Sequence, residues 1–533
     1  MLTYCHGLSA PVRYTPVHRA VHGNHQMVFS GDVMLQDLLK AADQNDVVEA
    51  LPYIAGSWGG EGPPTDRTGP YLRRIVSRAP AATEREIGTA VAQAGGYARQ
   101  MAGLAPAARA DILETASRNA LAHRDRLARL LALELGKPVK DSRTEIERVA
   151  STFAVCAAEA RRIDGETLPV AGWNTGIGNT AFTYRAPAGV ALAITPFNAP
   201  ANLLAHKLGA SFAAGNTTLV KAPPQAPAIS AAVVALLLDS GMPHQAVQLL
   251  HGGGDVGAAL CAADPVSVIS FTGSADTGAA VARAAGRKRL ALELGGNAAT
   301  IVCEDADAAA AAKISARTGY SNSGQSCISV QRVYVHRSRY AEFLDAFTAE
   351  VDALVVGDPL DDRTDVGSMV DENAAERVVA WSSEARRLGA SVIRGGTRDG
   401  ATAAPTIVAD PPVHASVVVH EVFGALVAVL PFDDFDTVLD QCNASRYGLQ
   451  AGLFTHDITR ILTAWRRLEV GGLIVNGTSN FRLDHVPFGG VKDSGFGREA
   501  PRWLIEDYTV VKTLVLRGLS IWGDSRELPK ENA

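Results

Sequence analysis

One cysteine of this chain stands in a setting that suits a nucleophile. Cys327 lies in the segment YSNSGQSC, among small and polar residues, directly before the apolar run VQRVYVH. The thiolate is the reactive form of cysteine, and an unperturbed thiol is already a few per cent ionised at neutral pH. An isolated cysteine is more often a small buried hydrophobic residue. The neighbouring motifs must therefore decide between a nucleophile and a core residue.

Two further residues have the chemistry to assist a nucleophile. Glu293 stands between leucines in ALELGG, and a carboxyl group on a buried strand is costly without a partner or a function. Burial would raise its pKa and make it a general base near neutral pH. Asn198, in TPFNAP, could donate its amide to a developing oxyanion, or it could cap a turn.

Glycine-rich and basic segments offer places for a phosphate group. The segment HGGGDVG, at 251–257, has the G-x-G-x-x-G spacing, which ordinary turns also produce. In FTGSADTG, Gly273 and Ser274 end a strand and open a helix whose first amides could hold a pyrophosphate, although Ser274 could be a simple N-cap. Lys221 follows the strand TTLV, so its ammonium group lies either at a ligand-binding sheet edge or at the surface.

Alternating strands and helices must position these residues. Apolar runs such as GVALAITPF, TTLVKAP, AVQLLHG, VSVISFTGS and RLALELGG alternate with helical segments at about 202–214, 228–240, 257–263 and 276–285. A second series of strands runs from ATIVCE to GGLIVNG, and helical spacing also occurs at 83–94, 108–135 and 141–162. This pattern predicts an α/β fold with parallel sheets in two Rossmann-like domains.

Composition excludes several classes of protein. The 533 residues exceed one hydrophobic core, and 50 basic against 56 acidic residues give a net charge of −6 without a dense basic run. Nucleic acid and membrane partners are therefore not expected. The six scattered cysteines indicate neither disulfides nor a metal site, and the apolar stretch at 231–238 is too short for a membrane span. With no secretory signal pattern, we expect a cytoplasmic protein that acts on a small molecule.

Seven motifs together resemble the NAD(P)-dependent aldehyde dehydrogenase superfamily. They are TPFN, KAPP, FTGS, ELGG, GQSC, HEVFG and PFGGVKDSGFGRE, in this order over about residues 50–520. The resemblance implies oxidation of an aldehyde to a carboxylic acid. Cys327 would form a thiohemiacetal and then a thioester, Asn198 and the Cys327 amide would form the oxyanion hole, and Glu293 would activate the hydrolytic water.

The resemblance also implies NAD or NADP as the cofactor. Lys221 would hold the adenosine ribose, and Gly273 and Ser274 the pyrophosphate. Glu421 would bind the nicotinamide ribose with Phe423 beside it, although alone Glu421 could be a helix-start acid. The cofactor site would also include the residues before Asn198, namely Thr195, Pro196 and Phe197. In this family the 252–257 turn does not hold the phosphates.

Two departures and one arginine bear on specificity. Pro224 occupies a position where NAD-preferring members often have glutamate, so no carboxylate there repels a 2′-phosphate. Phe197 replaces a frequent tryptophan. The runs NAPANLLAHKLG and SNFRLDHVPFGG look like those of members that oxidise lactaldehyde, glyceraldehyde phosphate or phosphonoacetaldehyde. Arg482 would then neutralise a substrate anion, or it could be a solvated loop residue.

The resemblance suggests limits for the domains. We expect an irregular extension at 1–49, with four histidines between positions 6 and 25, and an NAD(P)-binding domain from 50–165 and 186–293. A catalytic domain would span 294–490. The strands at 166–185 and 506–520 would pair with another subunit in a homodimer or homotetramer.

Other functions remain open at this point. A coenzyme-A-acylating semialdehyde dehydrogenase also uses a cysteine and NAD, but members of that branch generally lack the glutamate of ELGG. A cysteine hydrolase would combine Cys327 with a histidine and an asparagine and need no nicotinamide. A non-catalytic protein with this fold would have no reason to keep Cys327, Glu293 and Asn198 together.

Overall fold

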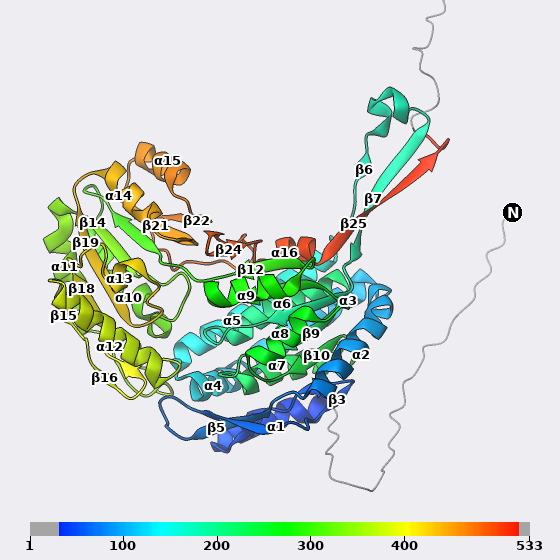
Figure 1. The fold of residues 1–533 in the computed structure, drawn as a ribbon, viewed down its shortest axis with the longest axis horizontal. Coiled ribbons are helices and arrows are strands. Elements are labelled where there is room, and N and C mark those ends of the chain that lie inside the picture. The colour runs from blue at the N-terminus through cyan, green and yellow to red at the C-terminus, as the bar shows by residue number, and fades with distance from the viewer. Residues whose placement is uncertain (1–30, 522–533) are drawn as a thin grey trace, which may run out of the picture.

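The computed structural model describes the backbone of residues 31–521 and the side chains from residue 34 onward. Two α/β bodies stand side by side, and an arm of three strands projects from one of them (Figure 1). The predicted α/β class, with two Rossmann-like sheets and a separate small β element, is confirmed. The domain limits given above remain a prediction.

The first body is built on an eight-stranded sheet. Its five central strands are parallel and carry the order β12-β11-β8-β9-β10. Strands β8 and β9 are buried at every position, and the fully apolar sequence of β8, VALAI, is typical of a strand that is covered on both faces. The strands are β12 (Arg289–Glu293), β11 (Val266–Thr272), β8 (Val190–Ile194), β9 (Thr217–Lys221) and β10 (Val247–Leu250), flanked by β24 (Gly495–Phe496), β2 (Tyr53–Ile54) and β3 (Ser57–Trp58).

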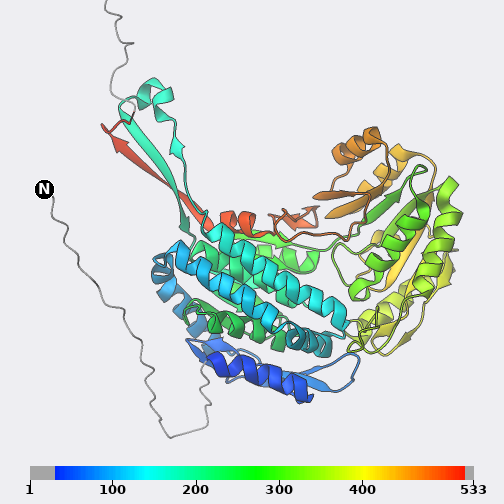
Figure 2. The same ribbon diagram turned by 180° about the vertical axis from the view of Figure 1, so that it is seen from behind.

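Helices cover both faces of this sheet. One face packs against α2 (Glu84–Ala102), α8 (Gly254–Ala262) and α9 (Ala275–Ala285). The other packs against α6 (Pro200–Ala214) and α7 (Pro227–Asp239), both almost wholly buried. Outside these lie the helices seen in cyan from behind in Figure 2, together with a short C-terminal helix: α3 (Pro106–Ala122), α4 (Arg124–Leu135), α5 (Val139–Ala160) and α16 (Pro501–Asp507). The helical pattern at 108–135 thus forms two helices, which meet at His123.

The second body has a seven-stranded sheet of order β15-β18-β19-β14-β13-β21-β22. All neighbours are parallel except β15 and β18. Its strands are β15 (Ser391–Arg394), β18 (Thr406–Ala409), β19 (Leu426–Phe432), β14 (Arg332–His336), β13 (Ala299–Val302), β21 (Gln450–Phe454) and β22 (Gly472–Val475). Its helices are α10 (Ala308–Tyr320), α11 (Arg337–Asp352), α12 (Glu372–Arg387), α13 (Ser416–Val419), α14 (Phe435–Asn443) and α15 (Ile458–Arg467).

The N-terminal region corrects one expectation. Residues 31–49 are not irregular, because they form α1 (Gly31–Gln44) and β1 (Val48–Glu49). Met34, Leu35, Leu38, Leu39 and Ala42 recur at helical spacing and are buried against α4 and α7. Strand β1 joins β5 (Ile75–Pro80) and β4 (Pro64–Thr68) in a small sheet. The four histidines between positions 6 and 25 lie outside the described residues.

The arm consists of β25 (Thr509–Arg517), β7 (Asn179–Pro187) and β6 (Thr167–Leu168), with β25 and β7 antiparallel over their whole length (Figure 1). Two 3-10 turns, Val170–Gly172 and Asn174–Gly176, connect β6 to β7. Several apolar side chains of the arm are exposed: Trp173, Val511, Leu514 and Val515. Two-stranded pairs join β16 (Arg398–Asp399) to β17 (Thr402–Ala403) and β20 (Tyr447–Gly448) to β23 (Val491–Lys492).

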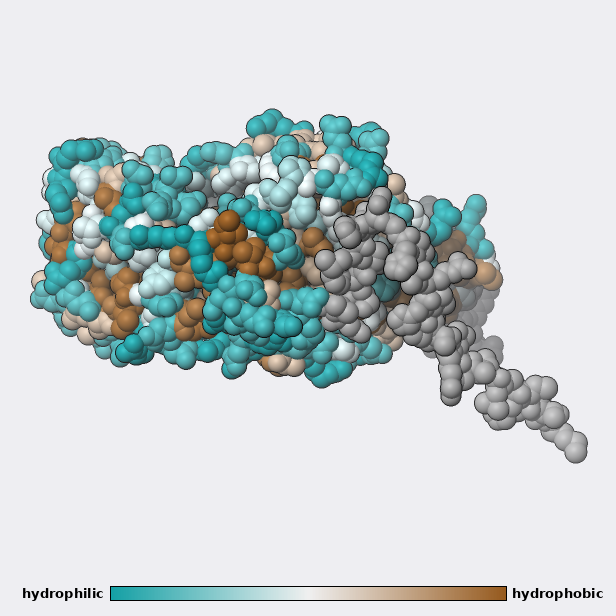
Figure 3. All heavy atoms as spheres, turned by 90° about the horizontal axis from the view of Figure 1, so that it is seen from below, coloured by the Kyte–Doolittle hydropathy of each residue, from teal (hydrophilic) through white to brown (hydrophobic). Residues whose placement is uncertain are grey.

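The surface is mixed in character. Figure 3 views the molecule from below and shows hydrophilic residues over most of that face, with hydrophobic residues gathered in a few patches. Among the described residues, no helix has the length and apolar character needed to cross a membrane.

Candidate active site

A cavity of about 1060 Å³ brings most of the predicted site residues together. The first body contributes residues that follow the carboxyl ends of its parallel strands, where ligands bind in open α/β sheets. The second body contributes the loops of Cys327 and Glu421 and a segment at 370–377, around the start of α12. The predicted residues that line the cavity are Thr195, Pro196, Phe197, Asn198, Lys221, Gly273, Ser274, Cys327, Glu421 and Phe423.

Cys327 lies in the loop between α10 and the amino end of β14. Its side chain is half-buried beside Ile328, Leu449 and Phe488. Burial raises the pKa of the Cys327 thiol to about 12, and the carboxyl groups of Glu421, Glu293 and Glu499 add to this rise. The thiol is therefore neutral at physiological pH in this state of the protein. Its backbone N–H makes no hydrogen bond within the described residues, so it is free to bind an oxyanion.

Asn198 ends the loop that follows β8 and points its amide toward the cysteine loop. Its Nδ2 atom donates to the carbonyl of Gln325 at 3.1 Å, two residues before Cys327. A side-chain amide has two donor hydrogens, so one remains for a ligand. The main-chain carbonyl of Asn198 accepts from Lys137 Nζ at 3.4 Å and from Asn322 Nδ2 at 3.0 Å. These bonds connect two loops, which is more than a local turn cap would do.

Glu293 ends β12 and is 4 % exposed. Neither carboxyl oxygen has a hydrogen-bond partner among the described residues. Burial raises the pKa of Glu293 well above its ordinary value, and the neighbouring charge of Glu499 raises it further. The carboxyl group does not line the cavity, although the next two residues do. It lies close enough to Cys327 for its charge to affect the pKa of the thiol.

The first body also presents unpartnered polar groups that suit a nucleotide. The ammonium group of Lys221 makes no hydrogen bond within the described residues, and its side chain is not at the surface, since it is 7 % exposed. Burial lowers the pKa of Lys221 to about 8, a fall that Asp255 opposes. Thr195 Oγ1 is buried and has no hydrogen-bond partner among the described residues.

The start of α9 has the geometry of an anion site. Ser274 is indeed the N-cap, because its Oγ accepts the N–H of Thr277 at 3.3 Å. Gly273, Ser274, Asp276 and Thr277 line the cavity, so the amino end of α9, where partial positive charge accumulates, borders it. Gly253, Gly254 and Gly257 of the glycine-rich turn also line the cavity.

The second loop of the second body carries Glu421 and Phe423. Glu421 is not a helix-start acid, since α13 ends at Val419 and the Glu421 Oε1 atom accepts the N–H of Gly296 at 2.9 Å. Burial raises the pKa of Glu421 to about 7. Phe423 packs edge-on against Phe197, with ring centroids 5.8 Å apart. Strands β14 and β19 are parallel neighbours, so the loops of Cys327 and Glu421, which precede them, lie side by side.

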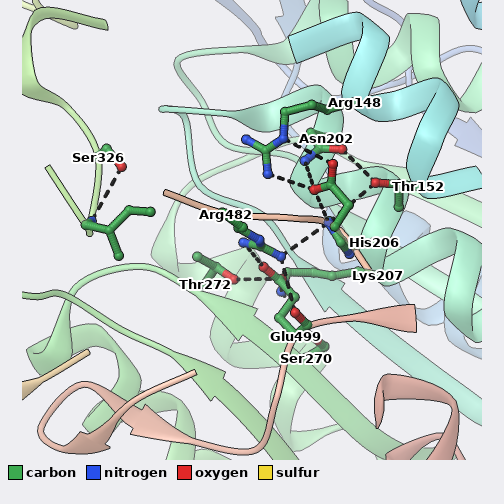
Figure 4. Close-up of polar contacts among 12 residues, drawn as sticks. Arg148, Thr152, Asn202, His206, Lys207, Ser270, Thr272, Ser326, Arg482 and Glu499 are labelled. Carbon is green, nitrogen blue, oxygen red and sulfur yellow. Dashed lines mark hydrogen bonds and ion pairs between the residues drawn. The ribbon is translucent and has the colours of Figure 1, made fainter. Parts of the chain in front are cut away.

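A buried network of charges, shown in Figure 4, includes Glu499, Arg482 and Lys207, whose charges affect the pKa of Glu293. Glu499 accepts from Lys207 at 2.8 Å and from Arg482 at 3.0 Å. Although burial opposes ionisation, these two cations lower the pKa of Glu499 to about 2. Arg482 also contacts His206 at 3.2 Å, and His206 contacts Asp484 at 3.0 Å. The sequence analysis did not single out Lys207 or Glu499, although both stand within quoted motifs, AHKLG and FGRE.

The structure places Arg482 inside this network. Its side chain is 8 % exposed, so it is not a solvated loop arginine. Its guanidinium stacks on the ring of Phe488 at 4.2 Å and donates to the carboxylate of Glu499 at 3.0 Å and to the main-chain carbonyl of Glu499 at 3.3 Å. Arg482 does not line the cavity, so its predicted role toward a substrate anion stays a prediction.

Arg148 is a more accessible cation that sequence reasoning missed, and like Arg482 it does not itself line the cavity. Its side chain is 33 % exposed, and its Nη2 and Nε atoms bind Asp484 at 2.7 and 3.2 Å. The Nη1 atom makes no hydrogen bond within the described residues. In Figure 4 the guanidinium groups of Arg148 and Arg482 lie on the side of the network that faces Ser326, the neighbour of Cys327. Only the fold could reveal this position, because Arg148 belongs to an otherwise ordinary helix.

Comparisons with known proteins agree with this geometry. Residues 59–514 match the aldehyde dehydrogenase family. The chain is 40 % identical over 465 residues to a 3-sulfolactaldehyde dehydrogenase of Priestia aryabhattai, covering 87 % of this chain and 97 % of that protein. Two solved structures are similar. Aldehyde dehydrogenase 21 from Physcomitrella patens, in complex with the reaction product succinate, has a TM-score of 0.86 at 32 % identity and covers 89 % of this chain and 99 % of its own. Glyceraldehyde-3-phosphate dehydrogenase GapN from Methanocaldococcus jannaschii, complexed with NADP, has a TM-score of 0.82 at 33 % identity and covers 85 % and 99 %.

Proposed function

Because this chain belongs to the aldehyde dehydrogenase family, and so oxidises an aldehyde to a carboxylic acid with NAD or NADP, we propose that its substrate is a small anionic aldehyde and that Cys327 is the nucleophile. The observation that carries the catalytic part is the shared cavity of Cys327, Asn198 and the cofactor-type residues. The named relatives act on, or are bound to, molecules with a sulfonate, a phosphate or a carboxylate, which supports the substrate class.

The side chains give each step a physical basis. Cys327 adds to the carbonyl carbon and passes its proton to solvent water as the bond forms, because a thiol with a raised pKa is scarcely ionised beforehand. The free donor of Asn198 and the N–H of Cys327 stabilise the oxyanion of the thiohemiacetal. NAD or NADP, when bound, accepts the hydride. Glu293 in its ionised form then removes a proton from the water that hydrolyses the thioester.

The alternatives fit less well. Among the described residues, no histidine lines the cavity, as a cysteine hydrolase would need. Family membership argues against that function as well. Acyl transfer to coenzyme A would leave Glu293 without a role, although it is buried with both oxygens unpartnered. Hydrolysis gives this costly group a function.

The residues of the first body fit a dinucleotide. We assign Lys221 to the adenosine ribose, Gly273 and Ser274 with the α9 amides to the pyrophosphate, and Glu421 to the nicotinamide ribose. Thr195, Pro196, Phe197 and Phe423 would complete the nicotinamide site. Lys221 has no carboxylate hydrogen-bonded to it, and position 224 is proline, so a 2′-phosphate meets an available cation rather than an acid. We therefore propose that the enzyme accepts NADP as well as NAD.

Arg148 is the group that we assign to the anion of the substrate. Asp484 fixes two of its nitrogens and leaves the third free, so the guanidinium is oriented before a ligand arrives. A charge-assisted bond to a sulfonate, phosphate or carboxylate would be stronger than one between neutral groups. Arg482 is paired with Glu499, and its positive charge would add to the electrostatic attraction between the site and the substrate anion.

A substrate series tests this assignment. We expect kcat/KM for 3-sulfolactaldehyde and glyceraldehyde 3-phosphate to exceed that for propanal at least about 100-fold, because the anion adds binding energy worth roughly 3 kcal/mol. Arg148→Met should remove most of this difference and leave the value for propanal within about threefold. Equal efficiencies for propanal and the anionic aldehydes in the wild-type enzyme would contradict the substrate class. Reduced cofactor, followed by absorbance with NAD and with NADP, is the measurement.

The arm suits an oligomer. Apolar side chains of β25 are exposed, and β22 is an unpaired edge of the second sheet with Val475 exposed beside it. An exposed apolar strand and an open sheet edge are complementary surfaces for a second copy. We propose a homodimer or homotetramer in the cytoplasm, where the five described cysteines, all free, would stay reduced. Light scattering in solution checks the assembly.

A further inference from the structure

The geometry points to Asp141 as a positioning residue, which holds the strained turn before Cys327 and thereby sets the nucleophile against Asn198. This inference rests on the proposed role of Cys327. Asp141 lies in the first turn of α5, far from the cysteine in sequence, and touches neither Cys327 nor the cavity. An acid in the first turn of a helix could otherwise serve only the helix dipole.

The turn that Asp141 binds is unusual. Asn322, Ser323 and Gly324 adopt consecutive left-handed conformations, with φ angles of +49°, +56° and +73°. Left-handed backbone is costly for residues with a Cβ atom, and such strain persists only where surrounding contacts enforce it. Gly324 must be glycine, because a Cβ there would collide with the carbonyl of Gly424. Asn322 and Ser323 keep their strain, so other contacts must hold them.

Asp141 supplies the charged contact. Its Oδ2 atom accepts the backbone N–H of Asn322 at 2.9 Å and the hydroxyl of Ser321 at 3.4 Å. Bonds to an ionised acceptor are stronger than neutral ones, and this one is made to the backbone of the first left-handed residue. On the other side of the turn, Ser323 Oγ donates to the carbonyl of Gly367 at 3.0 Å. The turn is thus held on one side by Asp141 of α5 and on the other by the carbonyl of Gly367.

The same helix face also holds the Asn198 loop. Asp141 and Glu145 are four residues apart, which places them on one side of α5 near its start, and Lys137 lies directly before the N-cap residue Pro138. Glu145 accepts the N–H groups of Ala201 and Asn202 at 2.9 and 3.3 Å, and Lys137 reaches the carbonyl of Asn198. Asn322 Nδ2 then closes the connection to that carbonyl at 3.0 Å. One helix thus holds the turn before Cys327 through Asp141 and the segment after Asn198 through Glu145.

Two substitutions separate positioning from a helix-dipole effect. Asp141→Ala removes the acceptor, whereas Asp141→Asn keeps an oxygen that can accept the Asn322 N–H but loses the charge. We expect Asp141→Ala to lower kcat about 100-fold, because small misplacements of a reacting group have effects of this size. KM for the aldehyde and Kd for NADP should stay within about threefold. Asp141→Asn should keep at least about a third of kcat, since its hydrogen bond remains.

The controls make the outcome decisive. Glu147→Ala removes another acid of α5, which pairs with Arg124 at the surface, and should leave kcat unchanged. Thermal unfolding and NADP binding show that each variant is folded. Unchanged kcat in Asp141→Ala, or equal losses in Asp141→Ala and Asp141→Asn, would overturn the inference. An active Cys327→Ala enzyme would instead refute the proposed nucleophile, so the two failures are distinguishable.

Discussion

On one side of the cavity, Lys221 is the last residue of β9, and Asn198 and Ser274 follow the carboxyl ends of β8 and β11. On the other side, Cys327 and Glu421 precede the amino ends of β14 and β19. The first group stands on short connections between regular elements. The second group stands on loops that include left-handed residues, Asn322, Ser323 and Phe423. The first body therefore offers a preformed binding surface, while the second holds its reactive groups in loops that other segments must constrain.

This difference suits the first body to cofactor binding and the second body to the chemical steps. Parallel strands fix the direction of their carboxyl ends without further help, which suits a cofactor site. A nucleophile needs a more exact position, and backbone strain at functional sites is tolerated where contacts over-determine it. Substitutions in the second body should therefore affect the chemical steps more than cofactor binding.

Cys327→Ala should give the largest difference between the two sides, because it removes the chemistry of the second body and leaves the cofactor site of the first body intact. Without the sulfur no thiohemiacetal forms, and we expect steady-state oxidation to fall at least about 10⁴-fold, because loss of a covalent nucleophile typically has effects of this size or larger. NADP binding, which depends on the first body, should stay within about threefold. Reduced-cofactor absorbance and NADP titration measure the two effects.

A second cysteine of the same body provides the control. Cys442 is buried at the end of α14, and Cys442→Ala should retain full kcat. Residual turnover above a few per cent in Cys327→Ala would contradict the proposed nucleophile.

Most of the site residues that the first body contributes could be predicted from the sequence. Apolar runs that end in Asn198, Lys221 and Ser274 predict strands, and the sheet rule then predicts that their ends meet. Glu293 was conspicuous because a carboxyl group in an apolar strand violates the usual pattern of burial. The helix at 31–44 was missed although its apolar residues repeat at helical spacing, because they pack on α4 and α7, whose position only the fold gives.

Glu293→Gln should separate the two chemical stages. Gln cannot remove a proton from water, so we expect one equivalent of reduced cofactor in a burst, followed by turnover about 10²- to 10⁴-fold slower than wild type. In the wild type, burial raises the pKa of Glu293, so the fraction of ionised base and the rate of hydrolysis should increase with pH beyond the range of an ordinary carboxyl group. Stopped-flow absorbance between pH 5 and 9 measures both.

Two results would be incompatible with this role of Glu293. One is a Glu293→Gln enzyme that turns over at the wild-type rate. The other is a wild-type rate of thioester hydrolysis that does not change between pH 5 and 9.

The second side could be predicted only in part. Motif resemblance identified Cys327 and Glu421, but their proximity depends on the parallel pairing of β14 and β19. The contacts that hold the loops join residues far apart in sequence, such as Asp141 with Asn322 and Lys207 with Glu499. No local spacing marks such pairs. Arg482 shows the same limit, because its ion pair with Glu499 was not predicted, while its role toward a substrate anion stays a prediction.

Glu421→Gln should give the smallest of these effects. It tests how strongly the loop of the second body buries Glu421, through the free energy of unfolding. Burial raises the pKa of Glu421 from 4.5 to about 7, so the folded wild-type protein binds a proton that the unfolded chain releases between these values. Its free energy of unfolding must therefore fall as pH rises from about 4.5 through 7, and the loss is complete above pH 7. Gln keeps the acceptor for the Gly296 N–H and does not titrate.

The stability of Glu421→Gln relative to wild type should thus increase by about 2 kcal/mol between pH 4 and pH 8, less than full burial would give because the side chain is partly exposed. Urea unfolding across this range measures the difference, and a difference that does not change with pH would show that the pKa of Glu421 is the same in the folded and the unfolded protein.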